Sequence, residues 1–102
     1  MNSKTIAYLK KTKIESDLDQ LLKSILDTLI NLNTTQKDKL EAVKKIIIRR
    51  TDLFIEIVTE DLPQQLIAEY LCTLKKTYIC ISVDSEYNDD VRSFCMEQVA
   101  TI

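Results

Sequence analysis

The side chains that could do catalytic chemistry are few, and their spacing does not bring them together. Two pairs of adjacent carboxylates, Glu60 with Asp61 and Asp89 with Asp90, are candidates for general acid–base catalysis. Neighbouring residues of a helix point about 100° apart, so these pairs do not converge and are better interpreted as helix-end charge. The chain has 0 histidines and 0 glycines, which removes the usual base near neutral pH and the phosphate-binding glycine loops. We therefore expect no enzyme activity and no cofactor.

Three cysteines, Cys72, Cys80 and Cys95, are the other reactive groups. They form no pair at the two-to-four-residue separation that zinc sites use, so we expect no metal site. Cys72 and Cys95 lie on or beside apolar stripes, which is typical of inert core thiols. The opening MNSKTIAYLKK lacks the apolar core of a signal peptide, and no stretch approaches the roughly 20 apolar residues that span a bilayer. These features predict a cytoplasmic protein with reduced thiols and no membrane contact.

A basic cluster in the middle of the chain could bind phosphates of nucleic acid. Acidic residues are interleaved with it, and the Glu41–Lys45 pair at i,i+4 is typical of a solvated helix face. The net charge of −2 adds no general attraction for a polyanion. We prefer a solvated face, and nucleic-acid binding through the basic face at 37–50 is the alternative function. The cluster comprises Lys37, Lys39, Lys44, Lys45, Arg49 and Arg50.

Two isoleucines outside the main apolar stripe of their helix suggest a contact surface. Ile48 and Ile55 lie seven residues apart, two helical turns, and charged residues surround them. Arg50 could anchor such a surface, because arginine is enriched at binding hot spots. The alternative is that this helix is buried from two directions. We predict a non-enzymatic interaction module, an inhibitor or adaptor, whose partner is an unidentified protein or a second copy in a homodimer. The predicted partner-binding residues are Lys44, Lys45, Ile48, Arg49, Arg50 and Ile55.

The elements that must position these residues are helices. A chain without glycine makes tight hairpins at high cost, whereas long helices with short polar loops suit it. DLDQLLKSILDTLINL, residues 17–32, places eight apolar side chains, including Leu26 and Ile30, on one half of a helical wheel, which predicts a broad buried face. AVKKIIIRRTDLFIEIV, residues 42–58, could be a helix or two strands. Its RRTD segment has no turn-forming residue, so we favour a helix with the core stripe running through Ile46 or Ile47 and Arg50.

The predicted fold is all-α: a single domain, residues 1–102, folded as a compact antiparallel bundle of four main helices. The helices span about 17–32, 36–60, 63–78 and 85–100. A short helix at 3–12, with Ile6 and Leu9 packed down, precedes them. A break near Thr51 and Asp52 is an option that would release Arg50 from the core face. The alternating TYICISVD, residues 77–84, is expected to be a frayed helix end or connector, with a strand as the alternative. Expected caps are Ser16 or Asp17, Thr34 or Thr35, Asp61, and Asp84 or Ser85.

Overall fold

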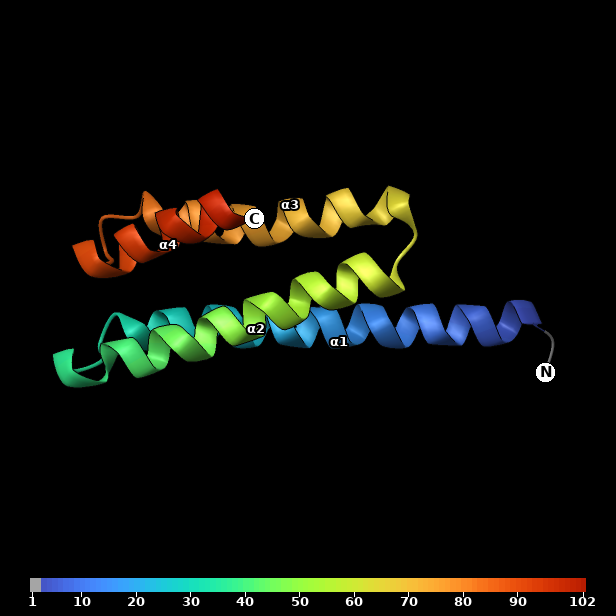
Figure 1. The fold of residues 1–102 in the computed structure, drawn as a ribbon, viewed down its shortest axis with the longest axis horizontal. Helices are drawn as coiled ribbons and strands as arrows, with labels where there is room; N and C mark the ends of the chain where they lie inside the picture. Colours follow the sequence, from blue (N-terminus) through green and yellow to red (C-terminus); the bar gives the residue numbers. More distant parts are fainter. Residues whose placement is uncertain (1–2) are drawn as a thin grey trace.

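The computed structural model describes the backbone of residues 3–102 and the side chains of residues 12–102. Its elements follow one another as α1 (Ser3–Leu32), the 3₁₀ turn η1 (Lys37–Lys39), α2 (Leu40–Asp61), α3 (Gln64–Ser82) and α4 (Asp89–Thr101). The helices run alternately up and down along an elongated bundle of 53 × 22 × 19 Å (Figure 1). No strand occurs between residues 3 and 102. The predicted all-α antiparallel bundle is confirmed.

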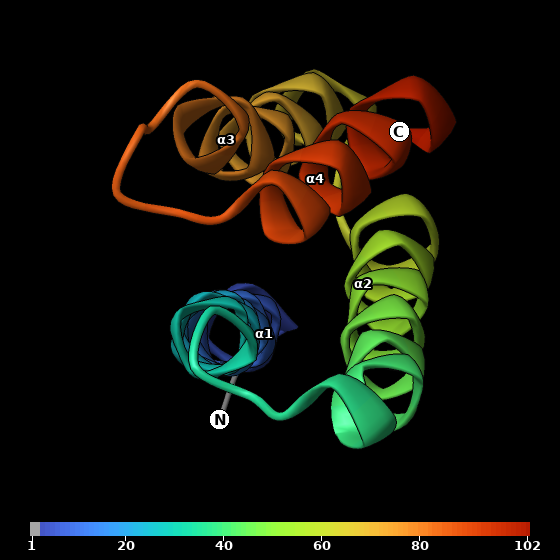
Figure 2. The same cartoon turned by 90° about the vertical axis from the view of Figure 1, so that its left-hand side faces the viewer.

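The bundle consists of two helix pairs with a shared core between them. α1 packs chiefly on α2, and α3 packs chiefly on α4, while α2 and α3 make a smaller contact. The end-on view in Figure 2 shows these pairs as two layers. Each helix contributes side chains at spacings of three, four or seven, as an amphipathic helix should. The buried apolar residues are Leu18, Ile25, Leu29, Leu32, Ile47, Phe54, Val58, Leu62, Leu74, Tyr78, Ile81, Val91, Phe94 and Cys95.

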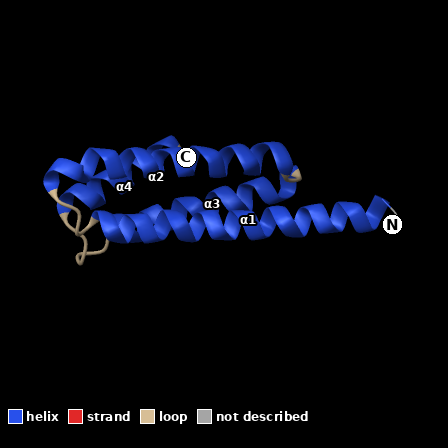
Figure 3. Ribbon diagram, turned by 90° about the horizontal axis from the view of Figure 1, so that it is seen from below, coloured by secondary structure: helices blue, strands red, loops and turns tan. Residues whose placement is uncertain are grey.

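The first helix is longer than predicted. The separate helix at 3–12 and the cap at Ser16 or Asp17 were wrong, because α1 is one continuous helix of 30 residues. Residues 13–16 contain no glycine or proline, so nothing interrupts the backbone hydrogen bonds. The N-terminal part of α1 projects beyond the turn between α2 and α3 (Figures 1 and 3). The predicted packing of Ile6 and Leu9 lies outside the described side chains.

The second helix runs unbroken through the segment where a break was considered. Thr51 is buried, and its hydroxyl shares a hydrogen bond of 2.5 Å with the Tyr78 hydroxyl of α3. Thr51 is therefore a core residue of α2 and caps no new helix. The expected frayed end or connector at 77–84 was also wrong. α3 continues to Ser82, because Tyr78 and Ile81, one turn apart, are both buried.

The turns are built without left-handed backbone. No residue among those described has a positive φ, the conformation that glycine adopts at least cost and that this chain avoids. At the end of α1, the Thr35 hydroxyl donates to the Asn31 carbonyl, so Thr35 closes this helix and does not cap the next. Asp61 is the last residue of α2, and Pro63 occupies the N-cap position of α3, which removes Asp61 as a cap.

Two asparagines join the turns at one end of the bundle. Asn88, and neither Asp84 nor Ser85, caps α4, since its side-chain oxygen accepts the Val91 N–H at 3.0 Å. The Asn88 N–H donates to the Asn33 side-chain oxygen at 2.7 Å, and the Asn88 amide donates to the Asn33 carbonyl at 3.2 Å. This pair holds the α1–α2 connection against the start of α4. Correct burial of the α4 face depends on that registration.

Candidate interaction surface

Two of the predicted partner-binding cations are engaged inside the bundle. The Lys44 ammonium lies 3.5 Å from the Glu41 carboxylate and 5.8 Å from the centre of the Phe94 ring. A cation over an aromatic face is held electrostatically by the ring. Arg50 is half-buried, and its Nη1 donates to the Thr28 hydroxyl of α1 at 2.5 Å. Arg50 therefore bridges α2 to α1, which explains its place beside the apolar stripe without a helix break.

The six predicted residues do not form a single patch. Lys45 and Arg49 are exposed, Ile48 is 38% exposed, and Ile55 is half-buried against the core. At 100° per residue, Ile48 and Ile55 lie on the flank of α2 that also carries Lys44, whereas Arg50 lies on the opposite flank facing α1. The structure thus separates the set between two sides of α2. Their partner-binding role stays a prediction.

A groove between α1 and α2 borders an exposed large apolar side chain. Its volume is about 430 Å³. Leu53, which borders it, is 47% exposed, and Ile46, two turns earlier on the same flank of α2, is 42% exposed. Arg50 lies between them. The lining residues are Asp17, Gln20, Leu21 and Ser24 from α1 and Leu53 and Ile57 from α2.

Sequence reasoning missed this groove because it assigned too many apolar residues to the core. Ile47 is fully buried, and Ile46 beside it is not. On α1, the broad buried face was overestimated: Leu26 and Ile30 are exposed, since this helix packs chiefly on one neighbour. The available signal was the seven-residue spacing of Ile46 and Leu53, which repeats the spacing of Ile48 and Ile55 on the other flank.

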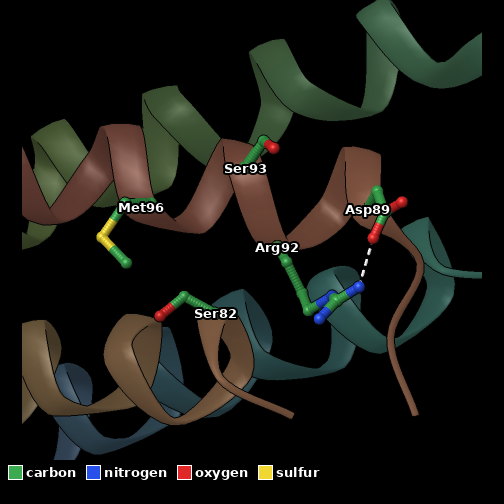
Figure 4. Close-up of a pocket in the computed structure, with 5 residues that line it drawn as sticks. All are labelled: Ser82, Asp89, Arg92, Ser93 and Met96. Atoms are coloured by element: carbon green, nitrogen blue, oxygen red, sulfur yellow. Dashed lines mark hydrogen bonds and ion pairs between the residues drawn. The ribbon is translucent and has the colours of Figure 1, made fainter. Parts of the chain in front are cut away.

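A second hollow lies between the end of α3 and the start of α4, with a volume of about 330 Å³ (Figure 4). Arg92 forms an ion pair with Asp89 there, as Figure 4 shows. The Arg92 Nε is buried without a hydrogen-bond partner among the described residues. The Asp89 carboxylate offsets the guanidinium charge, so this cleft has no net attraction for an anion. Ser82, Ser93 and Met96 complete the lining.

The titratable groups with shifted pKa values are not activated for chemistry. Burial raises the pKa of Cys95 to about 12, which keeps it a thiol, and burial raises the pKa of Tyr78 to about 12. A raised thiol pKa makes a cysteine unreactive at neutral pH. Cys72 and Cys80 are exposed, so the prediction of a core position for Cys72 was wrong.

Over the described part of the chain, no group of three or more potential ligands is placed to hold a metal ion.

No helix within the described residues is both long and apolar enough to cross a membrane. Comparisons with protein-family models, with curated proteins and with solved structures each found no match.

Proposed function

We propose that this chain is a non-enzymatic protein–protein interaction module that holds a helical segment in the groove between α1 and α2. The observation that supports this function is the exposure of Leu53 and Ile46, two helical turns apart, along one flank of α2. Amphipathic helices that lie in grooves present apolar side chains at i, i+3, i+4 and i+7. A seven-residue repeat on the receiving helix matches that spacing.

The groove has the composition of a contact surface. Its apolar lining consists of Leu53 and Ile57 from α2 and Leu21 from α1, and its polar lining on α1 is Asp17, Gln20 and Ser24. An apolar strip with a polar rim is the usual anatomy of a protein interface. Since full burial of a leucine contributes about 1.5–3 kcal/mol, covering the exposed half of Leu53 would contribute about 1 kcal/mol.

Arg50 gives this surface a fixed polar group. Its guanidinium donates to Thr28, whose hydroxyl in turn donates to the Ser24 carbonyl at 2.7 Å. An arginine that is already held in place loses little conformational entropy when a partner covers it. Arginine also recurs at binding hot spots. Arg50 is thus the residue of the sequence-predicted set that lies on the same flank of α2 as Leu53 and contacts α1.

The face predicted from the sequence and the nucleic-acid function remain alternatives. Lys45 and Arg49 are exposed and could contact phosphates, but Lys44 and Arg50 are already directed at neighbouring helices. With fewer free cations, the protein would make fewer phosphate contacts, and its affinity for nucleic acid would depend less steeply on salt.

We propose a cytoplasmic location, which the exposed thiols of Cys72 and Cys80 support, since reducing compartments keep thiols unpaired.

A displayed library of amphipathic helical peptides, selected on the whole protein, tests the proposed function. We expect selected peptides to lose about tenfold or more in affinity for Leu53→Asp, because a charge would replace an apolar contact. Met96→Asp is the matched control, since Met96 is 53% exposed on α4, away from the groove. Equal loss in both variants, or none in Leu53→Asp, would exclude the groove. Loss in Ile48→Asp alone would favour the sequence-predicted face.

A further inference from the structure

The backbone of the N-terminal part of α1 extends past the ends of the other helices (Figures 1 and 3). Ile14 is the first described side chain of α1 that packs against the core. Residues 3–13 would extend for about 16 Å at 1.5 Å per residue. Most of the stability of a helix in a protein comes from tertiary packing and not from local propensity. A second surface that covers it would stabilise it.

The charges along α1 are divided between its two halves. Residues 1–13 contain four lysines and no acidic residue. Residues 14–32 contain Glu15, Asp17, Asp19 and Asp27 and a single lysine, Lys23. The N-terminus is the positive end of the helix dipole and favours acidic residues, but the first turn of α1 has none. Two α1 helices laid antiparallel would place the basic half of each beside the acidic half of the other.

The groove and the projecting segment also share one helical face. The four groove positions on α1, residues 17, 20, 21 and 24, follow the spacing i, i+3, i+4 and i+7. Positions 6, 9, 10 and 13 repeat this spacing and continue the same face. An antiparallel register that sets Lys13 opposite Asp17 of the second copy also sets positions 10, 9 and 6 opposite positions 20, 21 and 24. This pairs a lysine with a glutamine and Leu9 with Leu21.

We propose that the occupant of the α1–α2 groove is the N-terminal half of α1 from a second copy of this chain, exchanged reciprocally in a two-fold dimer. Each copy contributes one projecting helix and one groove, so the contact is self-complementary and closes with two chains. The exposed Leu53 becomes covered by the incoming helix, and Asp17 receives the exposed Lys13 of the second copy. This inference rests on the proposed helix-binding function of the groove and names the partner.

Sedimentation equilibrium of the full chain over a range of concentrations tests the dimer. We expect the wild-type chain to change from monomer to dimer as its concentration rises, and to dissociate more readily as salt screens the charges. Leu53→Asp should weaken the dimer about tenfold or more, while Met96→Asp should leave it unchanged. Leu53 and Met96 are exposed, so both variants keep the fold, which circular dichroism verifies. A wild-type chain that stays monomeric throughout would overturn the proposal.

A charge exchange between two variants tests the antiparallel register. Lys13→Asp and Asp17→Lys should each weaken association about tenfold by itself, because each homodimer then contains two like-charge contacts. An equimolar mixture of the two variants restores two opposite-charge contacts and should associate within about threefold of wild type. A mixture no tighter than the single variants would refute this register. A monomeric wild type that still binds selected peptides at Leu53 would refute the second copy as occupant and leave the groove's function intact.

Discussion

Three consecutive isoleucines give the sharpest test of how α2 is buried. Ile47 is 0% exposed, whereas Ile46 and Ile48 are 42% and 38% exposed. Substituting each in turn by alanine removes the same atoms from three adjacent positions of one helix. Only Ile47→Ala should destabilise the protein severely, because its side chain alone lies wholly within the core between the helix pairs.

The magnitudes follow from burial. Ile47→Ala removes a fully buried side chain and leaves a cavity, which costs about 2–5 kcal/mol. Ile46→Ala and Ile48→Ala lose only part of a burial term of about 1.5–3 kcal/mol. Alanine also regains a few tenths of a kcal/mol, roughly 0.4, through its higher helix propensity. We therefore expect each of these two variants to lose less than about 1 kcal/mol.

Urea denaturation followed by circular dichroism at 222 nm measures the three free energies of unfolding. Thermal midpoints provide a second readout, at roughly 4–8 °C for each kcal/mol in a domain of this size. An Ile46→Ala or Ile48→Ala variant as unstable as Ile47→Ala would show that the flanks of α2 are core. If Ile46→Ala were that unstable, Ile46 would be buried, and the flank of α2 beside the α1–α2 groove would not be exposed there.

Three further outcomes follow from the polar contacts and pKa shifts. Asn88→Ala should lower the free energy of unfolding by about 1–2 kcal/mol, because it removes the α4 cap and the link to the α1–α2 turn. A smaller loss in urea denaturation would show that the cap is unimportant. Thr51→Val and Tyr78→Phe should each leave a buried hydroxyl without its partner and lower the free energy of unfolding by about 1–3 kcal/mol. The double variant should lose less than the sum of the two single losses. Additive losses would contradict the shared hydrogen bond. Burial raises the pKa of Tyr78 from 10.0 and that of Cys95 from 9.0, each to about 12 in the folded protein, so the unfolded chain loses these protons first. Stability should therefore fall as pH rises from 9 to 12, and a flat pH profile for the wild type, or an equally steep one in Tyr78→Phe, would contradict this.

The helical architecture was predictable because the absence of glycine and the apolar periodicity favour the same answer. The 42–58 segment illustrates this: its seven-residue spacings fit a helix, and its RRTD segment offers no hairpin turn. The alternation in 77–84 was misleading, because short apolar runs fit either period. Tyr78 and Ile81 are buried by packing against other helices, a tertiary effect that local sequence does not encode.

The surface was less predictable than the core. Which of two adjacent isoleucines points inward depends on where the neighbouring helices lie, and the sequence does not give their positions. Arg50 shows the same limit: its position beside the core stripe suggested a break, yet Thr28, 22 residues earlier, receives its guanidinium. The conflict between a charged side chain and its place beside the core is resolved here by a polar partner that is distant in the sequence. The α1–α2 groove arises from the same unpredicted arrangement.

Methyl resonances of the wild-type chain, followed as its concentration rises, test most directly whether the α1–α2 groove is the binding surface. We expect progressive shifts for Leu21, Leu53 and Ile57, which line the groove, and unchanged resonances for Ile48 and Ile55 on the opposite flank. Shifts confined to Ile48 and Ile55 would contradict it and support the interface predicted from the sequence. Resonances that do not move at any concentration would contradict the reciprocal dimer.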